Sequence, residues 1–166
     1  GPAFVWQQTI LDGVTATPAT ATAAKAQIDI WVMAAPLDVT LGTYASVLAR
    51  ARSYNLTGLP PSMIFDLAGE MIGASNPTGT VVGFTHGGTR LSLAMLYLSA
   101  TQIDDLGPAA SQTVASAFAA GPIARVILDG QPVVLVNVNG DPTFSITTDF
   151  VITGLGAATI MDFVLA

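Results

Sequence analysis

The single histidine of the sequence is the first residue to consider for catalysis. His86 is followed by two glycines, and His-Gly-Gly turns occur in serine esterases, where backbone N–H groups form an oxyanion hole. The sequence contains no Gly-x-Ser-x-Gly nucleophile motif and no second histidine to serve as the base of a triad. These absences disfavour a serine hydrolase, and we interpret His86 as a surface residue of a turn.

Carboxylates are the next residue type that can catalyse a reaction, because two of them facing each other across a cleft can cleave a glycosidic bond. Most of the acidic residues fall in expected turns or at strand ends, whereas Asp29, Asp149 and Asp162 fall within expected strands. A carboxylate in a strand usually faces solvent, so we assign no catalytic residue. If the protein is an enzyme, these three aspartates and His86 are the residues to test first.

Metal and cofactor motifs are weak in this chain. One histidine and no cysteine exclude the ordinary zinc centres. Asn137, Asn139 and Asp141 have an alternating spacing that resembles a calcium loop, but the later acidic ligand of an EF-hand is missing. Residues 76–83 are glycine-rich and fit neither a Walker loop nor a dinucleotide fingerprint. We expect turn chemistry at 137–141, no metal and no cofactor.

Aromatic side chains offer a third possibility, because they can stack on sugars. The candidates are Trp6, Trp31, Tyr44, Tyr54 and Tyr97. Aromatic residues are more often part of a core. They keep a small-molecule or carbohydrate-binding module open as an alternative function.

Composition limits the class of protein and its partners. The chain has 166 residues, of which 51% are hydrophobic and 10% charged, with a net charge of −6. Such a chain is too apolar to be disordered, and its apolar runs are shorter than the ~20 residues that cross a bilayer. The basic residues are scattered, which excludes the clustered footprint of a nucleic-acid-binding protein. They are Lys25, Arg50, Arg52, Arg90 and Arg125.

The elements that must position these residues are organised around residues 121–154. Three β-rich runs, 123–128, 133–138 and 143–152, are separated by Asp129-Gly130 and by the turn residues 139–142. Asp-Gly and Asn-Gly accept the positive φ of tight hairpins, so we expect a three-stranded antiparallel meander. The unbroken apolar run of the middle strand predicts burial on both faces.

Further strands and helices are expected on both sides of the meander. Gly1-Pro2 resembles the residues left after removal of a tag, and we exclude both from the prediction of the fold. We expect residues 3–166 to form one domain. Expected strands are 3–11, 27–34, 81–85, 89–99 and 159–166, with 81–85 and 89–99 forming a hairpin and 14–26 and 101–106 as connections. Expected helices are 43–54, capped by Thr43, and 108–120. Residues 62–74 fit a helix slightly better than a hairpin. A short echo, 148–152 and 161–165, would allow a hairpin between those two segments.

These elements predict an α+β single domain with a mainly antiparallel sheet and two or three short covering helices; a mostly β fold with one or two helices is the alternative. The leading functional hypothesis is a non-enzymatic structural or interaction subunit that self-assembles into a homo-oligomer, in an extracellular or viral-particle setting. Low charge, the single lysine and the missing catalytic constellation favour it. An enzyme with a carboxylate-centred site is the remaining alternative. We expect the apolar C-terminal strand, 159–166, to carry the contact between copies.

Overall fold

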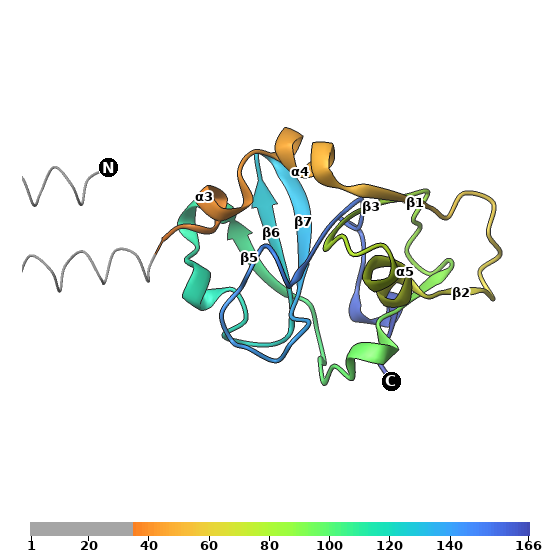
Figure 1. Ribbon diagram of the computed structural model, residues 1–166. Coiled ribbons are helices and arrows are strands. Elements are labelled where there is room, and N and C mark those ends of the chain that lie inside the picture. Colours follow the sequence, from red (N-terminus) through yellow and green to blue (C-terminus); the bar gives the residue numbers. More distant parts are fainter. Residues whose placement is uncertain (1–34) are drawn as a thin grey trace, which may run out of the picture. The chain divides into compact units, whose positions relative to one another are not determined.

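The computed structural model describes residues 35–166 of the chain (Figure 1). The strands expected at 3–11 and 27–34, the loop at 14–26 and Asp29 lie outside the described residues. The fold class is α+β, as the sequence predicts. Three short α-helices accompany nine strands in this part of the chain: α3 (Leu37–Leu41), α4 (Tyr44–Arg50) and α5 (Leu67–Gly73).

Six strands form the larger sheet. In spatial order they are β1 (Arg52–Asn55), β3 (Thr78–Val82), β8 (Phe150–Thr153), β7 (Gln131–Val136), β6 (Ile123–Leu128) and β5 (Asp104–Pro108). Strands β6, β7 and β8 pair antiparallel, which confirms the meander, although the third strand begins at Phe150 and residues 143–149 of the expected strand form a loop. Its first turn places Asp129 at φ 51° and Gly130 at φ 77°, the left-handed pair that a type I′ hairpin requires.

The remaining pairings are parallel, so the prediction of a mainly antiparallel sheet is wrong. β1 pairs with β3, β3 with β8 and β5 with β6, each in parallel. Parallel neighbours need long crossover connections, and the chain between β1 and β3 supplies one that contains α5. Local alternation of apolar and polar residues does not record strand direction, which is why sequence reasoning missed this feature.

A smaller, wholly parallel sheet joins three short strands, β2 (Ile64–Phe65), β4 (Arg90–Ser92) and β9 (Phe163–Val164). Its strand order, β2-β4-β9, follows the order β1-β3-β8 of the parallel strands at one edge of the larger sheet. The chain runs from β1 to β2 with no strand between them, and does the same from β3 to β4 and from β8 to β9. Three loops, residues 56–63, 83–89 and 154–162, therefore meet where the two sheets join.

Apolar side chains cover both faces of the larger sheet. Val134 and Val136 of β7 belong to a cluster that includes α5, whereas Val133 and Leu135 belong to a second cluster that includes α3 and Val47 of α4. The middle strand of the meander is thus buried on both faces, as its apolar run predicts. A strand enclosed in this way anchors the fold, because its burial removes apolar surface on two sides from water.

Helix α4 confirms the first part of the helix expected at 43–54. Thr43 and Ser46 form a reciprocal capping box, in which each side chain accepts the other residue's backbone N–H. The helix ends at Arg50 because Ala51 is extended, and the expected last turn is strand β1 instead. The strand propensity of Tyr54 and its burial in the core outweigh the helical pattern there.

Residues 62–74 contain the favoured helix in shortened form, α5, preceded by the short strand β2, and the hairpin alternative is wrong because 70–72 is helical and β2 pairs with β4. Asp66 caps helix α5 by accepting the Gly69 N–H at 3.0 Å. A Cβ atom at residue 69 would lie 2.2 Å from an Asp66 carboxylate oxygen. The glycine that weakens the helical pattern is therefore the residue that allows this cap to form.

Three other expectations are wrong. Strands β3 and β4 lie in different sheets, so 81–85 and 89–99 form no hairpin, and the connection expected at 101–106 contains strand β5. Residues 108–120 form two 3₁₀ turns instead of a helix, because Gln112 is extended and its carbonyl accepts the Leu37 N–H. The segments of the sequence echo begin β8 and β9, which do not pair with each other.

Candidate functional site

The junction of the two sheets brings together residues that are far apart in the sequence. The loops at 56–63, 83–89 and 154–162 follow the carboxyl ends of β1, β3 and β8, which are parallel neighbours. In open sheets with parallel strands, ligands characteristically bind outside these ends. This junction is the place where the fold favours a site.

His86 and Asp162, two of the four residues proposed for an enzyme, meet at this junction. His86 Nδ1 lies 2.7 Å from Asp162 Oδ2, and the Gly87 N–H donates to Asp162 Oδ1 at 2.9 Å. The Thr159 N–H donates to Oδ2 at 2.8 Å. The Asp162 side chain is 3% exposed and that of His86 55% exposed. The histidine is a turn residue, as expected, but it is bound to a buried carboxylate rather than isolated.

The electrostatics of Asp162 favour its charged form. Burial by itself would raise the pKa of the carboxyl, but the hydrogen bonds from the Gly87 and Thr159 N–H groups and from His86 outweigh burial and lower the pKa. A charged carboxylate holds the histidine proton on Nδ1, which leaves Nε2 as a hydrogen-bond acceptor in the neutral ring. The pair therefore presents an oriented imidazole to solvent.

Asp149, the third described candidate, lies elsewhere and faces no solvent. Its oxygens accept the Val138 N–H at 3.0 Å and the Ser145 N–H at 2.8 Å, closing the loop between β7 and β8. Burial raises the pKa of Asp149 despite these two hydrogen bonds, and the nearby charge of Asp141 raises it further. Two expectations are wrong for Asp149 and Asp162: each precedes a strand rather than lying within it, and each is buried because its carboxylate binds backbone N–H groups in the interior.

A hollow of about 270 Å³ opens beside the histidine and receives residues from all three junction loops. Its lining consists of Pro61, His86, Gly87, Gly88, Arg90, Met161 and Asp162. Arg90 stands at the start of β4 and is exposed. Three other guanidinium groups are already engaged. Arg50 donates to the Leu41 carbonyl, Arg52 lies over the Tyr54 ring, and Arg125 binds Asp105 and two carbonyls. Among residues 35–166, Arg90 alone of the arginines has no such partner.

The loop at 137–141 has the turn chemistry expected from its sequence. Asn137 Oδ1 accepts the Gly140 N–H, Asn139 Oδ1 accepts the Asp141 N–H, and Asp141 Oδ1 accepts the Thr143 N–H. These oxygens therefore bind backbone N–H groups. Within the described part of the chain, no group of three or more His, Asp or Glu side chains is arranged to hold a metal ion.

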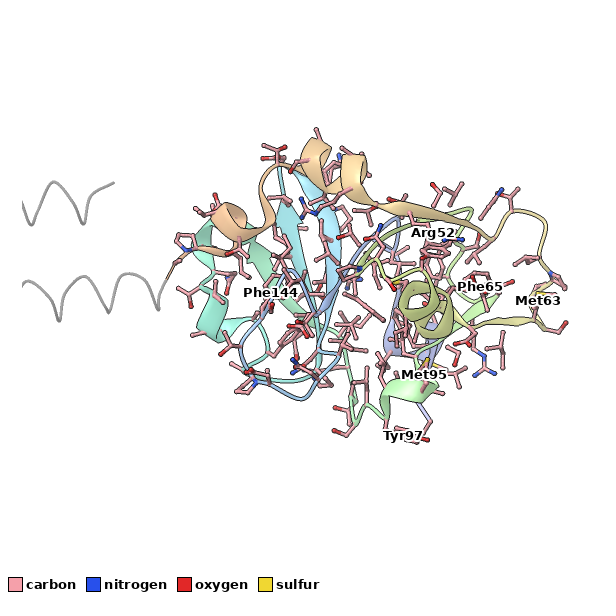
Figure 2. The ribbon with its side chains drawn as sticks, viewed as in Figure 1. Arg52, Met63, Phe65, Met95, Tyr97 and Phe144 are labelled. Carbon is pink, nitrogen blue, oxygen red and sulfur yellow. The ribbon has the colours of Figure 1, made fainter. Side chains whose placement is uncertain are left out.

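A second surface is defined by exposed apolar side chains around α5. Ile72 of α5 is exposed, as is Met95 of the 3₁₀ turn η1 (Ala94–Leu96), which contacts α5. Tyr97 follows η1 directly and is 84% exposed. Figure 2 shows Met95 and Tyr97 together at one margin of the molecule, on the side that carries α5 and β2. We call Ile72, Met95 and Tyr97 the α5–η1 surface.

Tyr97 also has the most unusual backbone conformation of the three residues in this surface. Its φ and ψ are 52° and 49°, the left-handed region that a bulky aromatic residue rarely adopts. Such strain persists only where surrounding structure imposes it, and it concentrates at functional positions. The other described tyrosines are covered to a greater extent, since Tyr54 is buried and Tyr44 is half-buried.

Comparisons with known proteins give no family for this chain. No protein-family model, no curated protein and no solved structure matches it. Within residues 35–166, no helix is long and apolar enough to span a bilayer.

Sequence reasoning gave no site role to Pro61, Arg90 and Met161 of the hollow or to Ile72 and Met95 of the α5–η1 surface. It considered Tyr97 only as one of five aromatic residues. Arg90 adjoins the His-Gly-Gly turn in the sequence, which was a usable signal for a polar site there. The pairing of His86 with Asp162 joins segments 76 positions apart, and no local pattern reports it.

Proposed function

We propose that this protein is a non-enzymatic structural or interaction subunit that assembles with copies of itself through the α5–η1 surface. The observation that carries the proposal is Tyr97, a strained tyrosine with 84% of its surface exposed. Tyrosine is enriched among the residues that dominate protein–protein binding, because it offers a large, rigid and amphipathic contact. Packing against a neighbouring subunit would remove its ring from water.

The composition of the chain supports the same proposal. Only 10% of the residues are charged, Met95 is exposed near Tyr97 (Figure 2), and Ile72 is exposed on α5, which η1 contacts. Methionine adapts to irregular partner surfaces, and exposed apolar side chains on adjacent elements are typical of an interaction site. A net charge of −6 gives modest repulsion between copies, which salt screens at physiological ionic strength.

The C-terminal segment is a weaker candidate for the contact than the sequence indicates. Strand β9 is reduced to Phe163–Val164, and it already pairs with β4 inside the same chain. Phe163 is buried in the core of its own subunit. Met161 is the one widely exposed apolar residue of this segment, and it lines the hollow beside His86. For these reasons we place the proposed contact on the α5–η1 surface.

The test compares the masses of the wild-type chain and three variants by size-exclusion chromatography coupled to light scattering. We expect Tyr97→Ser to weaken association at least about tenfold, because an interface residue of this kind contributes about 2 kcal/mol or more. Met95→Ser should act in the same direction with a smaller effect. Val39→Ser is the matched control, since Val39 is 72% exposed on α3, away from this surface. Equal masses for wild type and Tyr97→Ser at every concentration would refute the proposed contact.

A further inference from the structure

The hollow beside His86 has the position and the construction of a ligand site. It lies at the carboxyl ends of β1, β3 and β8, and each of the three junction loops contributes to its wall. Its polar side chains come from segments far apart in the sequence: His86 from the loop at 83–89, Arg90 from the start of β4, and Asp162 from the loop at 154–162. Any ligand placed here would therefore contact groups that only the folded chain brings together.

The two accessible polar side chains of the hollow differ in what they can bind. The Arg90 guanidinium is a fork of donors that matches the two oxygens of a carboxylate, and no described residue occupies it. His86 is an acceptor at Nε2 in its neutral form, because Asp162 holds the proton on Nδ1. A ligand that satisfies both groups carries an anionic oxygen pair for Arg90 and a hydroxyl donor for His86.

The charge of the hollow limits the anion to a single negative charge. Asp162 is buried behind His86, and its oxygens accept hydrogen bonds from Gly87, Thr159 and the histidine. A dianion such as phosphate would meet this fixed negative charge with only one guanidinium to compensate it. A monocarboxylate matches the single charge of Arg90.

The rest of the wall is apolar or lacks a side chain. Pro61 and Met161 border the hollow, Met161 is 78% exposed, and Gly87 and Gly88 add backbone without bulk. A thioether and a proline ring bind apolar groups, so the body of the ligand is expected to be a short hydrocarbon or an aromatic ring.

The geometry points to a binding site for a small hydroxycarboxylate, in which Arg90 binds the carboxylate, His86 Nε2 accepts the hydroxyl proton, and Pro61 and Met161 contact the apolar body. This inference is independent of the proposed assembly, because the α5–η1 surface contributes no residue to the hollow.

Mandelate is the probe that carries all three features, and two analogues each lack one. Phenylacetate lacks the hydroxyl, and mandelamide lacks the negative charge. Since His86 is the only histidine in the chain, its ring signals in an NMR spectrum report binding at this place without ambiguity. We expect mandelate to shift these signals saturably, phenylacetate to bind several-fold more weakly, and mandelamide to bind at least about tenfold more weakly.

Variants assign the two roles. Arg90→Gln should weaken the binding of mandelate at least about tenfold. Arg52→Gln, which removes a guanidinium that lies over the Tyr54 ring, should leave the binding of mandelate unchanged. In His86→Ala, calorimetry should find mandelate and phenylacetate equal, because the acceptor of the hydroxyl is gone. The inference is overturned if mandelate gives no saturable shift, if Arg90→Gln binds as well as wild type, or if Arg52→Gln loses as much. Equal binding of mandelate and phenylacetate to wild type overturns the role of His86.

Discussion

Asp149 and Asp162 occupy the same position in two similar segments, Asp-Phe-Val-Ile and Asp-Phe-Val-Leu, but their side chains make different contacts. Each aspartate precedes or begins a strand, is almost fully buried and accepts two backbone N–H groups. Among residues 35–166 the Asp149 side chain has no further hydrogen-bond partner, and it closes a loop of the meander. Asp162 also accepts the Thr159 hydroxyl at 3.5 Å and contacts the half-exposed His86, and through His86 it reaches the hollow at the sheet junction.

This difference explains why the pKa values of the two carboxyls are shifted in opposite directions, although burial by itself raises both. For Asp149, burial exceeds the effect of its two hydrogen bonds and raises the pKa. For Asp162, burial is opposed by the same kind of backbone donors and also by His86, and the pKa is lowered. A buried carboxylate that binds only backbone stabilises a loop, whereas one that also binds an exposed side chain can orient that side chain toward a ligand.

Replacing either aspartate by alanine should cause the largest loss of stability among the substitutions proposed here. Asp149→Ala leaves the Val138 and Ser145 N–H groups without a partner in the interior, which should lower the free energy of unfolding by about 3 kcal/mol. Asp141→Ala is the control in the same loop, and its exposed carboxylate should cost less than about 1 kcal/mol. Urea unfolding measures both values. Equal losses for the two variants would show that Asp149 is not the clamp of this loop.

The pH dependence of stability should separate the two aspartates by sign. Because the folded pKa of Asp162 is lowered, its stabilising contribution is present above the unfolded pKa of about 3.9 and is lost as the pH falls through the folded value. The stability gap between wild type and Asp162→Asn should therefore narrow in acid. The folded pKa of Asp149 is raised, so protonation of this carboxyl favours the folded state. The difference in free energy of unfolding between wild type and Asp149→Asn should therefore widen as the pH falls from 7 toward 3.

Unfolding of the wild type and both asparagine variants at a series of pH values checks these signs. Parallel curves for the two variants would mean that the aspartates have the same environment, contrary to the comparison drawn here.

His86→Ala should have the smallest effect on folding. The side chain is 55% exposed, and Asp162 keeps its two backbone donors when the imidazole is removed. We expect a loss below about 1 kcal/mol by thermal or urea unfolding, in the range of exposed ion pairs. A loss as large as that of Asp162→Ala would place His86 in the structural framework rather than in a ligand site.

The sequence predicts those parts of the fold that depend on neighbours in the chain. The Asp129-Gly130 turn, the Thr43 cap and the doubly buried middle strand follow from local residue types, and the α+β class follows from the elements together. Strand direction does not follow, because it is set by crossovers such as the one between β1 and β3. Residues 108–120 have helical propensity, but the backbone pairing of Gln112 with Leu37 overrides it.

The candidate site shows the same division. Asp149, Asp162 and His86 are identifiable from the sequence as residues to test, because few side chains in this chain can do chemistry. Their roles depend on contacts between loops that follow three different strands, which residue spacing cannot reveal. The exposure of Tyr97 is likewise a property of the packed structure, in which the alternation of residues 89–99 misleads because β4 ends at Ser92.

The most direct test of the proposed function is the mass of the full wild-type chain in solution, measured by sedimentation equilibrium over a range of concentrations. Self-assembly through the α5–η1 surface predicts a mass above that of one chain, falling toward one chain on dilution. The same measurement on Tyr97→Ser should reach the single-chain mass at higher concentration. A wild-type chain with the mass of one subunit at every concentration would contradict self-assembly.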